Sequence, residues 1–224
     1  KLNTALERMS GSVSWVKVGM ELFYREGPDI VRRLKDQGYH IFLDLKMHDI
    51  PNTVERAAAN LAPLGVEMFN MHAAGGYDMM SRAAAAAFES AKNNGCKAPL
   101  LLGVTVLTSI APEIWRNEIK GGLEVADQVL HFASLVKRAG LNGVVCSPEE
   151  VARVKSLCGS EFLTVVPGIR PVWAATGDQK RFTTPAQALA AGADYLVVGR
   201  PVMAASDPKA AVERILEEME ESKQ

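Results

Sequence analysis

The stretch FLDLKMHDIPNT, residues 42–53, carries two charged residues, Asp44 and Lys46, inside an otherwise apolar strand pattern. Side chains two positions apart in a strand point to the same face, so Asp44 and Lys46 are expected on one face. Leu43 and Leu45 are expected on the other face, where they can pack against helices. The stretch therefore predicts a strand whose final residues point charged side chains into a polar site.

Short apolar runs alternate with helical patterns along the whole chain, which predicts an α/β fold. The runs are almost continuously apolar, as is typical of parallel strands that helices cover on both faces. Two helical segments open with Ser-Pro or Thr-Pro, a cap followed by a first-turn proline. The predicted strands are residues 14–19, 40–46, 66–72, 99–106, 143–146, 162–168 and 195–199. The predicted helices are residues 27–38, 52–65, 78–95, 122–140, 148–159 and 184–192.

The repeat of strand and helix fits either an open doubly wound sheet or a closed (β/α)8 TIM barrel. Seven strands are predicted, and the chain opens with an amphipathic pattern, Leu2, Ala5, Leu6 and Met9, that predicts a helix with no strand before it. The evenness of the repeat favours a barrel whose first β-strand is missing from this sequence. No change of composition or flexible linker divides residues 1–224, so we expect a single domain.

The composition excludes several classes of partner. The chain has 224 residues, with 25 Lys and Arg against 26 Asp and Glu, so no basic field favours nucleic acid or an anionic membrane surface. No apolar run approaches the roughly 20 residues of a membrane span, and the N-terminus lacks the apolar core of a signal peptide. The three dispersed cysteines, Cys96, Cys146 and Cys158, suit a reducing compartment, so we expect a cytoplasmic protein.

A second charged strand suggests that the first one is functional. The run SWVKVG places Lys17 inside its own apolar strand, and together with Asp44, Lys46 and Asp49 it forms a set of two lysines and two aspartates near strand ends. Barrel enzymes draw catalytic groups from the carboxyl ends of strands and the loops that follow. The alternative is a buried Asp–Lys ion pair that only links strands, but the desolvation of such a pair usually makes apolar packing as good or better. We favour a catalytic array.

The last strands predict a phosphate site. Gly199 and Arg200 follow the final strand, and the long loop at residues 169–185 contains Arg170 and Gln179. Glycine permits close approach of the backbone, and a guanidinium binds phosphate through two hydrogen bonds. Surface arginines at loop starts are the alternative. P-loop and dinucleotide motifs are absent from the sequence.

Two residues that follow strands have two readings each. Thr108 follows the strand LLLGVTV and either offers its hydroxyl to a ligand or caps the loop. His72 ends the strand VEMFNMH and either enters a site or serves a structural role.

These motifs together resemble one enzyme family. The run DLKMHDIPNT, with KVGMELF before it and PGIRP, GDQKR and VVGRP after it, resembles the orotidine 5′-phosphate decarboxylases, especially their bacterial members, over essentially the whole chain. The DxKxxD core is shared with related sugar-phosphate decarboxylases and aldolases, whereas HDIPNT combined with Lys17 is more specific. Magnesium-dependent relatives are expected to carry an acidic ligand where Lys17 stands.

The resemblance implies a homodimeric (β/α)8 barrel that decarboxylates orotidine 5′-monophosphate to UMP in pyrimidine biosynthesis, with no metal and no organic cofactor. It implies that Asp44 lies against the substrate carboxylate, that Lys46 protonates C6, and that Lys17 orders the array and contacts ribose. Asp49 and Thr53 would complete the site of the neighbouring subunit. Further substrate contacts are implied for Thr108 at the pyrimidine, for Gln179, Gly199 and Arg200 at the phosphate, and for Arg170 at a further ligand-binding position.

One feature of the family has no counterpart here, and it keeps two alternatives open. The family's first strand ends in an aspartate that binds ribose, and nothing in this sequence matches that segment. One alternative is a magnesium-dependent sugar-phosphate decarboxylase or aldolase on the same barrel. The other is an inactive nucleotide-binding barrel that lacks the first strand.

Overall fold

The computed structural model describes residues 6, 8–9, 11–174 and 183–221. The chain forms two compact units, and each is built from separate stretches of sequence. Unit 2 comprises residues 14–105 and 130–144, and unit 1 comprises residues 1–13, 106–129 and 145–224.

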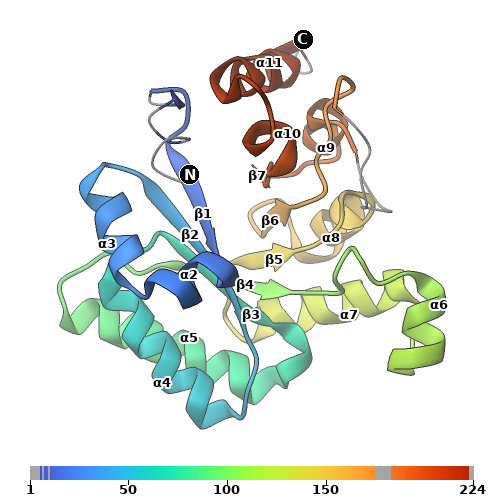
Figure 1. The fold of residues 1–224 in the computed structure, drawn as a ribbon. Helices are drawn as coiled ribbons and strands as arrows, with labels where there is room; N and C mark the ends of the chain where they lie inside the picture. Colours follow the sequence, from blue (N-terminus) through green and yellow to red (C-terminus); the bar gives the residue numbers. More distant parts are fainter. Residues whose placement is uncertain (1–5, 7, 10, 175–182, 222–224) are drawn as a thin grey trace. The chain divides into compact units, whose positions relative to one another are not determined.

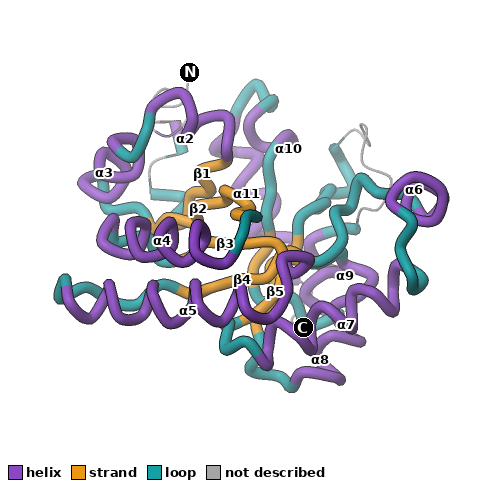
Figure 2. Tube along the Cα trace, turned by 90° about the horizontal axis from the view of Figure 1, so that it is seen from below, coloured by secondary structure: helices purple, strands orange, loops and turns teal. Residues whose placement is uncertain are grey.

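Unit 2 is built on parallel strands whose order follows the chain. Its strands are β1 (Trp15–Gly19), β2 (His40–Met47), β3 (Met68–His72) and β4 (Leu100–Val104), and β5 (Gly143–Val145) begins in it. Its helices are α2 (Met20–Glu26), α3 (Asp29–Asp36), α4 (Pro51–Leu61) and α5 (Gly76–Asn93), with short 3-10 turns η1 (Ala62–Leu64) and η2 (Ala73–Gly75). Helices α4 and α5 lie side by side in both views (Figures 1 and 2).

Unit 1 contains the remaining strands, β6 (Leu163–Val166) and β7 (Tyr195–Leu196), which pair in parallel. Helix α7 (Val125–Arg138) passes from unit 1 into unit 2. The other helical segments of unit 1 are α6 (Pro112–Ile114), the π-helical turn η3 (Trp115–Ile119), the 3-10 turn η4 (Pro148–Glu150), α8 (Val151–Cys158), α9 (Pro185–Ala190), α10 (Arg200–Met203) and α11 (Pro208–Glu221).

The α/β prediction is confirmed. All seven predicted strands form within the described residues, each within three residues of its expected ends, and their order follows the chain from β1 to β7. Four helices of the described residues, α2, α6, α10 and α11, were not predicted. Helix α2 has only seven residues and buries none of them, so it is too short for a helical period to be recognised in the sequence. The helix predicted near residues 2–9 falls largely outside the described residues.

Two helices begin at the caps that the sequence predicts. Ser147 and Thr184 each accept a hydrogen bond from a backbone N–H of the following turn, and the side chains of Glu150 and Gln187 bond back to the capping residues. Each cap is followed by a proline in the first turn, where a missing N–H costs nothing. No helix in the described residues has the length and apolar character needed to cross a bilayer.

A polar residue stands immediately before each of the strands β3, β5 and β7. Its side chain accepts a hydrogen bond from a backbone N–H near the start of the preceding strand, β2, β4 or β6. The carboxylate of Glu67, just before β3, accepts from the Ile41 N–H of β2 at 2.6 Å. The amide oxygen of Asn142, just before β5, accepts from the Leu101 N–H of β4 at 2.8 Å. In each pair the backbone N–H of the polar residue returns a hydrogen bond to the carbonyl of its partner.

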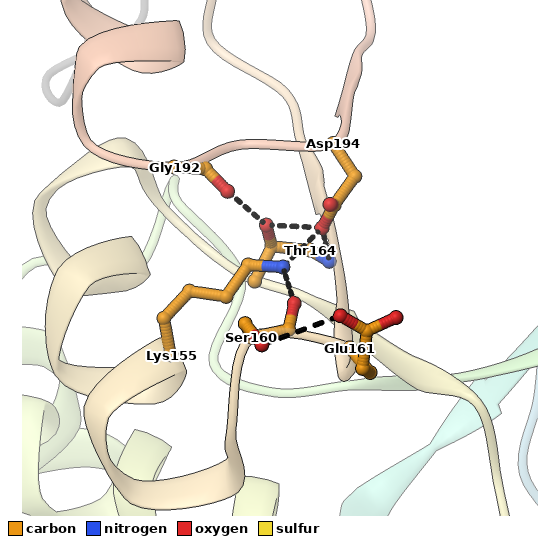
Figure 3. Close-up of polar contacts among 6 residues, drawn as sticks. All are labelled: Lys155, Ser160, Glu161, Thr164, Gly192 and Asp194. Atoms are coloured by element: carbon orange, nitrogen blue, oxygen red, sulfur yellow. Dashed lines mark hydrogen bonds and ion pairs between the residues drawn. The ribbon is translucent and has the colours of Figure 1, made fainter.

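The third contact of this kind lies in unit 1, where Asp194 stands just before β7 (Figure 3). Its Oδ2 accepts from the Thr164 N–H of β6 at 2.7 Å and from Lys155 Nζ at 2.7 Å. The three residues Glu67, Asn142 and Asp194 are called the strand-start clamps below. They satisfy backbone donors at the amino ends of strands, so the carboxyl ends remain available for chemistry.

Candidate functional site

The carboxylate of Asp44 lies at the centre of a polar cluster in unit 2. Asp44 is only 7 % exposed, and its Oδ2 pairs with Lys17 Nζ at 2.9 Å. Its Oδ1 accepts from Lys46 Nζ at 2.6 Å and from Asn70 Nδ2 at 2.7 Å. The structure thus brings three of the four charged residues of the predicted array together, from strands β1 and β2.

Strand register explains how Lys17 reaches Asp44. Strand β1 pairs with β2 so that Gly19 lies beside Asp44, and Lys17 is two residues earlier on the same face. A Cβ at Gly19 would lie 3.2 Å from Lys17 Nζ. The absence of a side chain at Gly19 therefore leaves room for the ammonium group to extend over it to the carboxylate.

Lys46 does not follow the regular strand geometry that the sequence predicts. Its φ is +52°, in the left-handed region that side chains other than glycine rarely adopt, and the register of β2 against β3 shifts between Leu43 and Met47. Simple alternation therefore fails at this residue, although its ammonium still meets Asp44. Backbone strain of this kind clusters at functional sites in proteins, where the surrounding structure holds the strained residue in place.

Asn70 belongs to the cluster and was not identified from the sequence. It lies in the middle of β3, is fully buried, and bonds to both Asp44 and the backbone N–H of Lys46, the latter at 2.8 Å. Its signal in the sequence is a single amide within the apolar run VEMFNMH. A buried polar residue in a strand is informative because it needs partners, but the partners are not visible in the sequence.

The electrostatics of the cluster favour an ionised Asp44. Burial raises the pKa of Asp44, but the two ammonium groups and the Asn70 amide outweigh burial and hold the pKa below its ordinary value. The carboxylate of Asp44 is therefore ionised near neutral pH. Such a cluster can present an acid, Lys46, next to a fixed negative charge.

His72 ends β3 beside this cluster. Its ring centroid lies 5.4 Å from that of His48. Burial lowers the pKa of His72, and the nearby charges of His48 and Lys46 lower it further. The neutral imidazole is favoured, so His72 adds a polar but uncharged group next to the lysine.

Asp49 and Thr53 lie apart from the cluster's hydrogen bonds, where α4 begins. Both are exposed, and Asp49 Oδ1 accepts from the backbone N–H of Ile50 at 2.8 Å. Ile50 is a large apolar residue with 67 % of its surface exposed. This segment offers both polar groups and an apolar side chain to another surface.

The predicted phosphate residues lie in unit 1. Arg170 is buried, and its backbone N–H donates to the Thr183 carbonyl at 2.8 Å, which ties the two described ends of the long loop together. Gly199 and Arg200 are exposed at the start of α10, and Thr108 is half-buried in the turn after β4. Gln179 lies outside the described residues.

The cluster has little capacity for a metal ion. Both carboxylate oxygens of Asp44 already contact ammonium groups. In the described part of the chain, no three His, Cys, Asp or Glu side chains gather in the way that a metal site requires.

Comparisons with known proteins agree with this geometry. The family model described as "Orotidine 5'-phosphate decarboxylase / HUMPS family" matches residues 1–215. A protein named orotidine 5′-phosphate decarboxylase from Carboxydothermus hydrogenoformans is 52% identical over 96% of this chain and 89% of its own length. A protein of the same name from Syntrophotalea carbinolica is 51% identical over 96% of this chain and 87% of its own length.

A solved structure shows the same fold. The crystal structure of orotidine 5′-phosphate decarboxylase from Lactobacillus acidophilus matches with a TM-score of 0.86 and 45% identity, covering 97% of this chain and 92% of that chain. The parallel α/β fold is therefore that of the (β/α)8 barrels of this family, as the sequence predicted, rather than an open sheet. The chain belongs to the orotidine 5′-phosphate decarboxylase family.

Proposed function

We propose that this protein decarboxylates orotidine 5′-monophosphate to UMP in pyrimidine biosynthesis. The observation that carries the proposal is the contact of 2.6 Å between the Lys46 ammonium and the buried, ionised carboxylate of Asp44. Relatives named orotidine 5′-phosphate decarboxylase at about half identity support the choice of substrate. The reaction needs an acid fixed beside a carbon that becomes negative, and the cluster supplies one.

In the proposed reaction the bond between C6 of the pyrimidine and its carboxylate breaks, and carbon dioxide leaves. The electron pair stays on C6, where the ammonium of Lys46 stabilises the developing negative charge. Lys46 then donates a proton to C6, and solvent returns a proton to the resulting amine. Asp44 holds the Lys46 ammonium in place and lies against the substrate carboxylate, so that loss of carbon dioxide relieves a repulsion.

Lys17 is proposed to hold Asp44 in place and to contact the ribose. Its ammonium bonds the Asp44 oxygen that faces away from Lys46, so each oxygen of the carboxylate is fixed by a different lysine. The proton donor is a side chain and no electrons leave the substrate, so the proposed step requires no metal and no organic cofactor.

The phosphate and base contacts are proposed for residues of unit 1. Gly199 and Arg200 would bind the phosphate through the backbone and the guanidinium. Gln179 would add a phosphate contact, Arg170 a further ligand contact, and Thr108 a contact to the pyrimidine. Gly199 and Arg200 are exposed at the start of α10, which supports placing a ligand contact there.

We further propose a single-domain, cytoplasmic homodimer in which Asp49 and Thr53 complete the site of the partner subunit. The exposure of both residues, and of Ile50 between them, supports a contact surface at the start of α4. The dispersed cysteines support a reducing compartment.

The rival function is a magnesium-dependent reaction on a sugar phosphate, because related barrels share the DxKxxD core. The ammonium of Lys17, 2.9 Å from Asp44, would repel a divalent cation at that carboxylate. This contact favours the metal-independent decarboxylase.

One assay separates the two functions. Purified protein is mixed with orotidine 5′-monophosphate in the presence of EDTA, and the loss of substrate absorbance and the formation of UMP are followed. Turnover that EDTA leaves unchanged is expected. Absence of turnover, or turnover that requires added magnesium, would contradict the proposed function.

A further inference from the structure

We propose that Asn70 is a positioning residue of the decarboxylation site, which sets both the carboxylate of Asp44 and the backbone of Lys46. This inference rests on the proposed function for its kinetic consequences. Its structural basis is the pair of hydrogen bonds that the Asn70 amide makes, one with each of these two residues.

The two hydrogen bonds of Asn70 assign the orientation of its amide. A backbone N–H can only donate, so the atom that faces the Lys46 N–H at 2.8 Å must be the carbonyl oxygen. The amide nitrogen then faces Asp44 Oδ1 at 2.7 Å and donates to it. An ionised carboxylate can only accept, so the amide nitrogen of Asn70 is the matching donor. This hydrogen bond is strongest when Asp44 is charged.

The first consequence concerns the rotation of the Asp44 carboxylate. Oδ1 receives Lys46 and Asn70, while Oδ2 receives Lys17. Asn70 is the uncharged donor of the three, and it comes from a neighbouring strand, β3, rather than from a flexible lysine chain. It therefore fixes the carboxylate even when Lys46 turns toward the substrate to donate its proton.

The second consequence concerns the left-handed backbone of Lys46. This conformation is strained for a residue other than glycine, so surrounding contacts must hold Lys46 in it. The bond from the Lys46 N–H to a fully buried amide on the next strand is such a contact. The direction in which the Lys46 side chain leaves the strand is therefore set by β3.

A purely structural role for Asn70 would be to join β3 to β2. Asn142 provides a matched control, because its amide oxygen also accepts from a backbone N–H of a neighbouring strand at 2.8 Å, but at the amino ends of the strands. Replacement of either asparagine by alanine removes the same kind of bond. Only the Asn70 change should alter the chemistry.

The test compares Asn70→Ala, Asn70→Asp and Asn142→Ala by steady-state kinetics and thermal unfolding. Asn70→Ala should lower kcat by about 10- to 100-fold, the effect of losing a hydrogen bond to a charged group, with a smaller change in KM. Asn70→Asp keeps an acceptor for the Lys46 N–H but sets a second carboxyl against Asp44, so kcat should fall and the acid limb of the pH profile should move to higher pH. Asn142→Ala should lower Tm and leave kcat unchanged.

A second measurement does not depend on turnover. In protein labelled with ¹³C at the aspartate carboxyls, the Asp44 signal, assigned by its loss in Asp44→Asn, should titrate at lower pH than that of an ordinary aspartate in the wild type. In Asn70→Asp the carboxyl pair should titrate at higher pH, as two coupled groups. This measurement decides the question even if Asn70→Ala does not fold.

The proposal is overturned if both Asn70 variants show only a lower Tm, as expected for Asn142→Ala, while kcat and the titration of Asp44 stay unchanged. If the wild type does not decarboxylate orotidine 5′-monophosphate, the proposed function fails instead. The titration in Asn70→Asp would still show whether Asn70 controls Asp44.

Discussion

Asp44 accepts from side chains on three successive strands, Lys17 on β1, Lys46 on β2 and Asn70 on β3. A buried carboxylate without partners would protonate instead of staying charged. The partners keep it ionised, so burial strengthens its interaction with Lys46 rather than removing its charge. The two predictions at this scale separate the chemical role of the cluster from its contribution to stability.

Lys46→Ala should abolish detectable decarboxylation, a loss of at least about 100-fold, because it removes the proposed proton donor. UMP should still bind, which isothermal calorimetry can measure. Lys97→Ala, at an exposed position before β4, is the control and should retain full activity. Substantial turnover by Lys46→Ala would refute the assignment of the acid.

Asp44→Asn should change the way stability depends on pH. Because the folded pKa of Asp44 is lowered, its ionised form stabilises the fold above the unfolded value, and this contribution is lost as pH falls through the folded pKa. The difference in free energy of unfolding between wild type and variant should therefore be largest above about pH 4 and shrink below it. Urea unfolding at several pH values measures this difference.

The control for this experiment is Asp29→Asn, since Asp29 lies exposed at the start of α3. Asp29 pairs with Arg32 at the surface, where ion pairs contribute little, so this variant should differ from the wild type much less than Asp44→Asn does. A difference between Asp44→Asn and wild type that does not vary with pH would argue against an ionised, stabilising Asp44.

The strand-start clamps show a two-strand period at the level of elements. Glu67, Asn142 and Asp194 stand immediately before β3, β5 and β7, and each fixes the second residue of the preceding strand. Lysines of the helices α3 and α8 pair with the two carboxylate clamps. The same contact recurs at every second strand, where an acceptor side chain binds the backbone N–H of the second residue of the preceding strand.

Asp194→Ala should destabilise the fold without affecting kcat. It leaves the buried Thr164 without its carboxylate partner, at a cost of about 1–3 kcal/mol, which corresponds to a fall in Tm of about 2–12 °C for a chain of this size. Differential scanning calorimetry measures the change. Glu161→Ala, at an exposed position in the same close-up (Figure 3), should shift Tm little. Equal shifts for the two variants would contradict the role of the clamp.

At the scale of the whole molecule, the proposed dimer divides one site between two chains. Symmetry makes this testable, because an Asp49 that serves the partner and a Lys46 that serves its own subunit can be inactivated separately. In a mixed dimer of Lys46→Ala and Asp49→Ala subunits, one site would carry both changes and the other would be intact.

Each parent dimer should therefore be inactive or nearly so, whereas the mixed dimer should recover about half of wild-type activity. Co-expression with two different affinity tags isolates the mixed dimer, and sedimentation checks its mass. Failure to recover activity in isolated mixed dimers would place Asp49 in the site of its own subunit or outside the site. Failure to obtain mixed dimers would argue against the dimer itself.

Local patterns predicted much of the fold and three of the four residues of the cluster. The alternation of apolar runs and helices located all seven strands, and Ser147 and Thr184 were visible as caps, because these features depend on residues near one another in sequence. Asp44 and Lys46 stood out because charge in an apolar strand is unusual. Helix α2 was missed because its seven residues are too few for a helical period to be recognised.

The sequence by itself determined the α/β class and the presence of lysines and an aspartate at neighbouring strand ends. Only the tertiary structure decided that Asn70 completes the cluster, that Lys46 adopts a left-handed backbone conformation, and that Gly19 makes room for Lys17. The physical reason is register. A strand pattern shows which face a residue occupies, but its hydrogen-bond partners depend on how strands distant in sequence align, which is set only when the sheet forms.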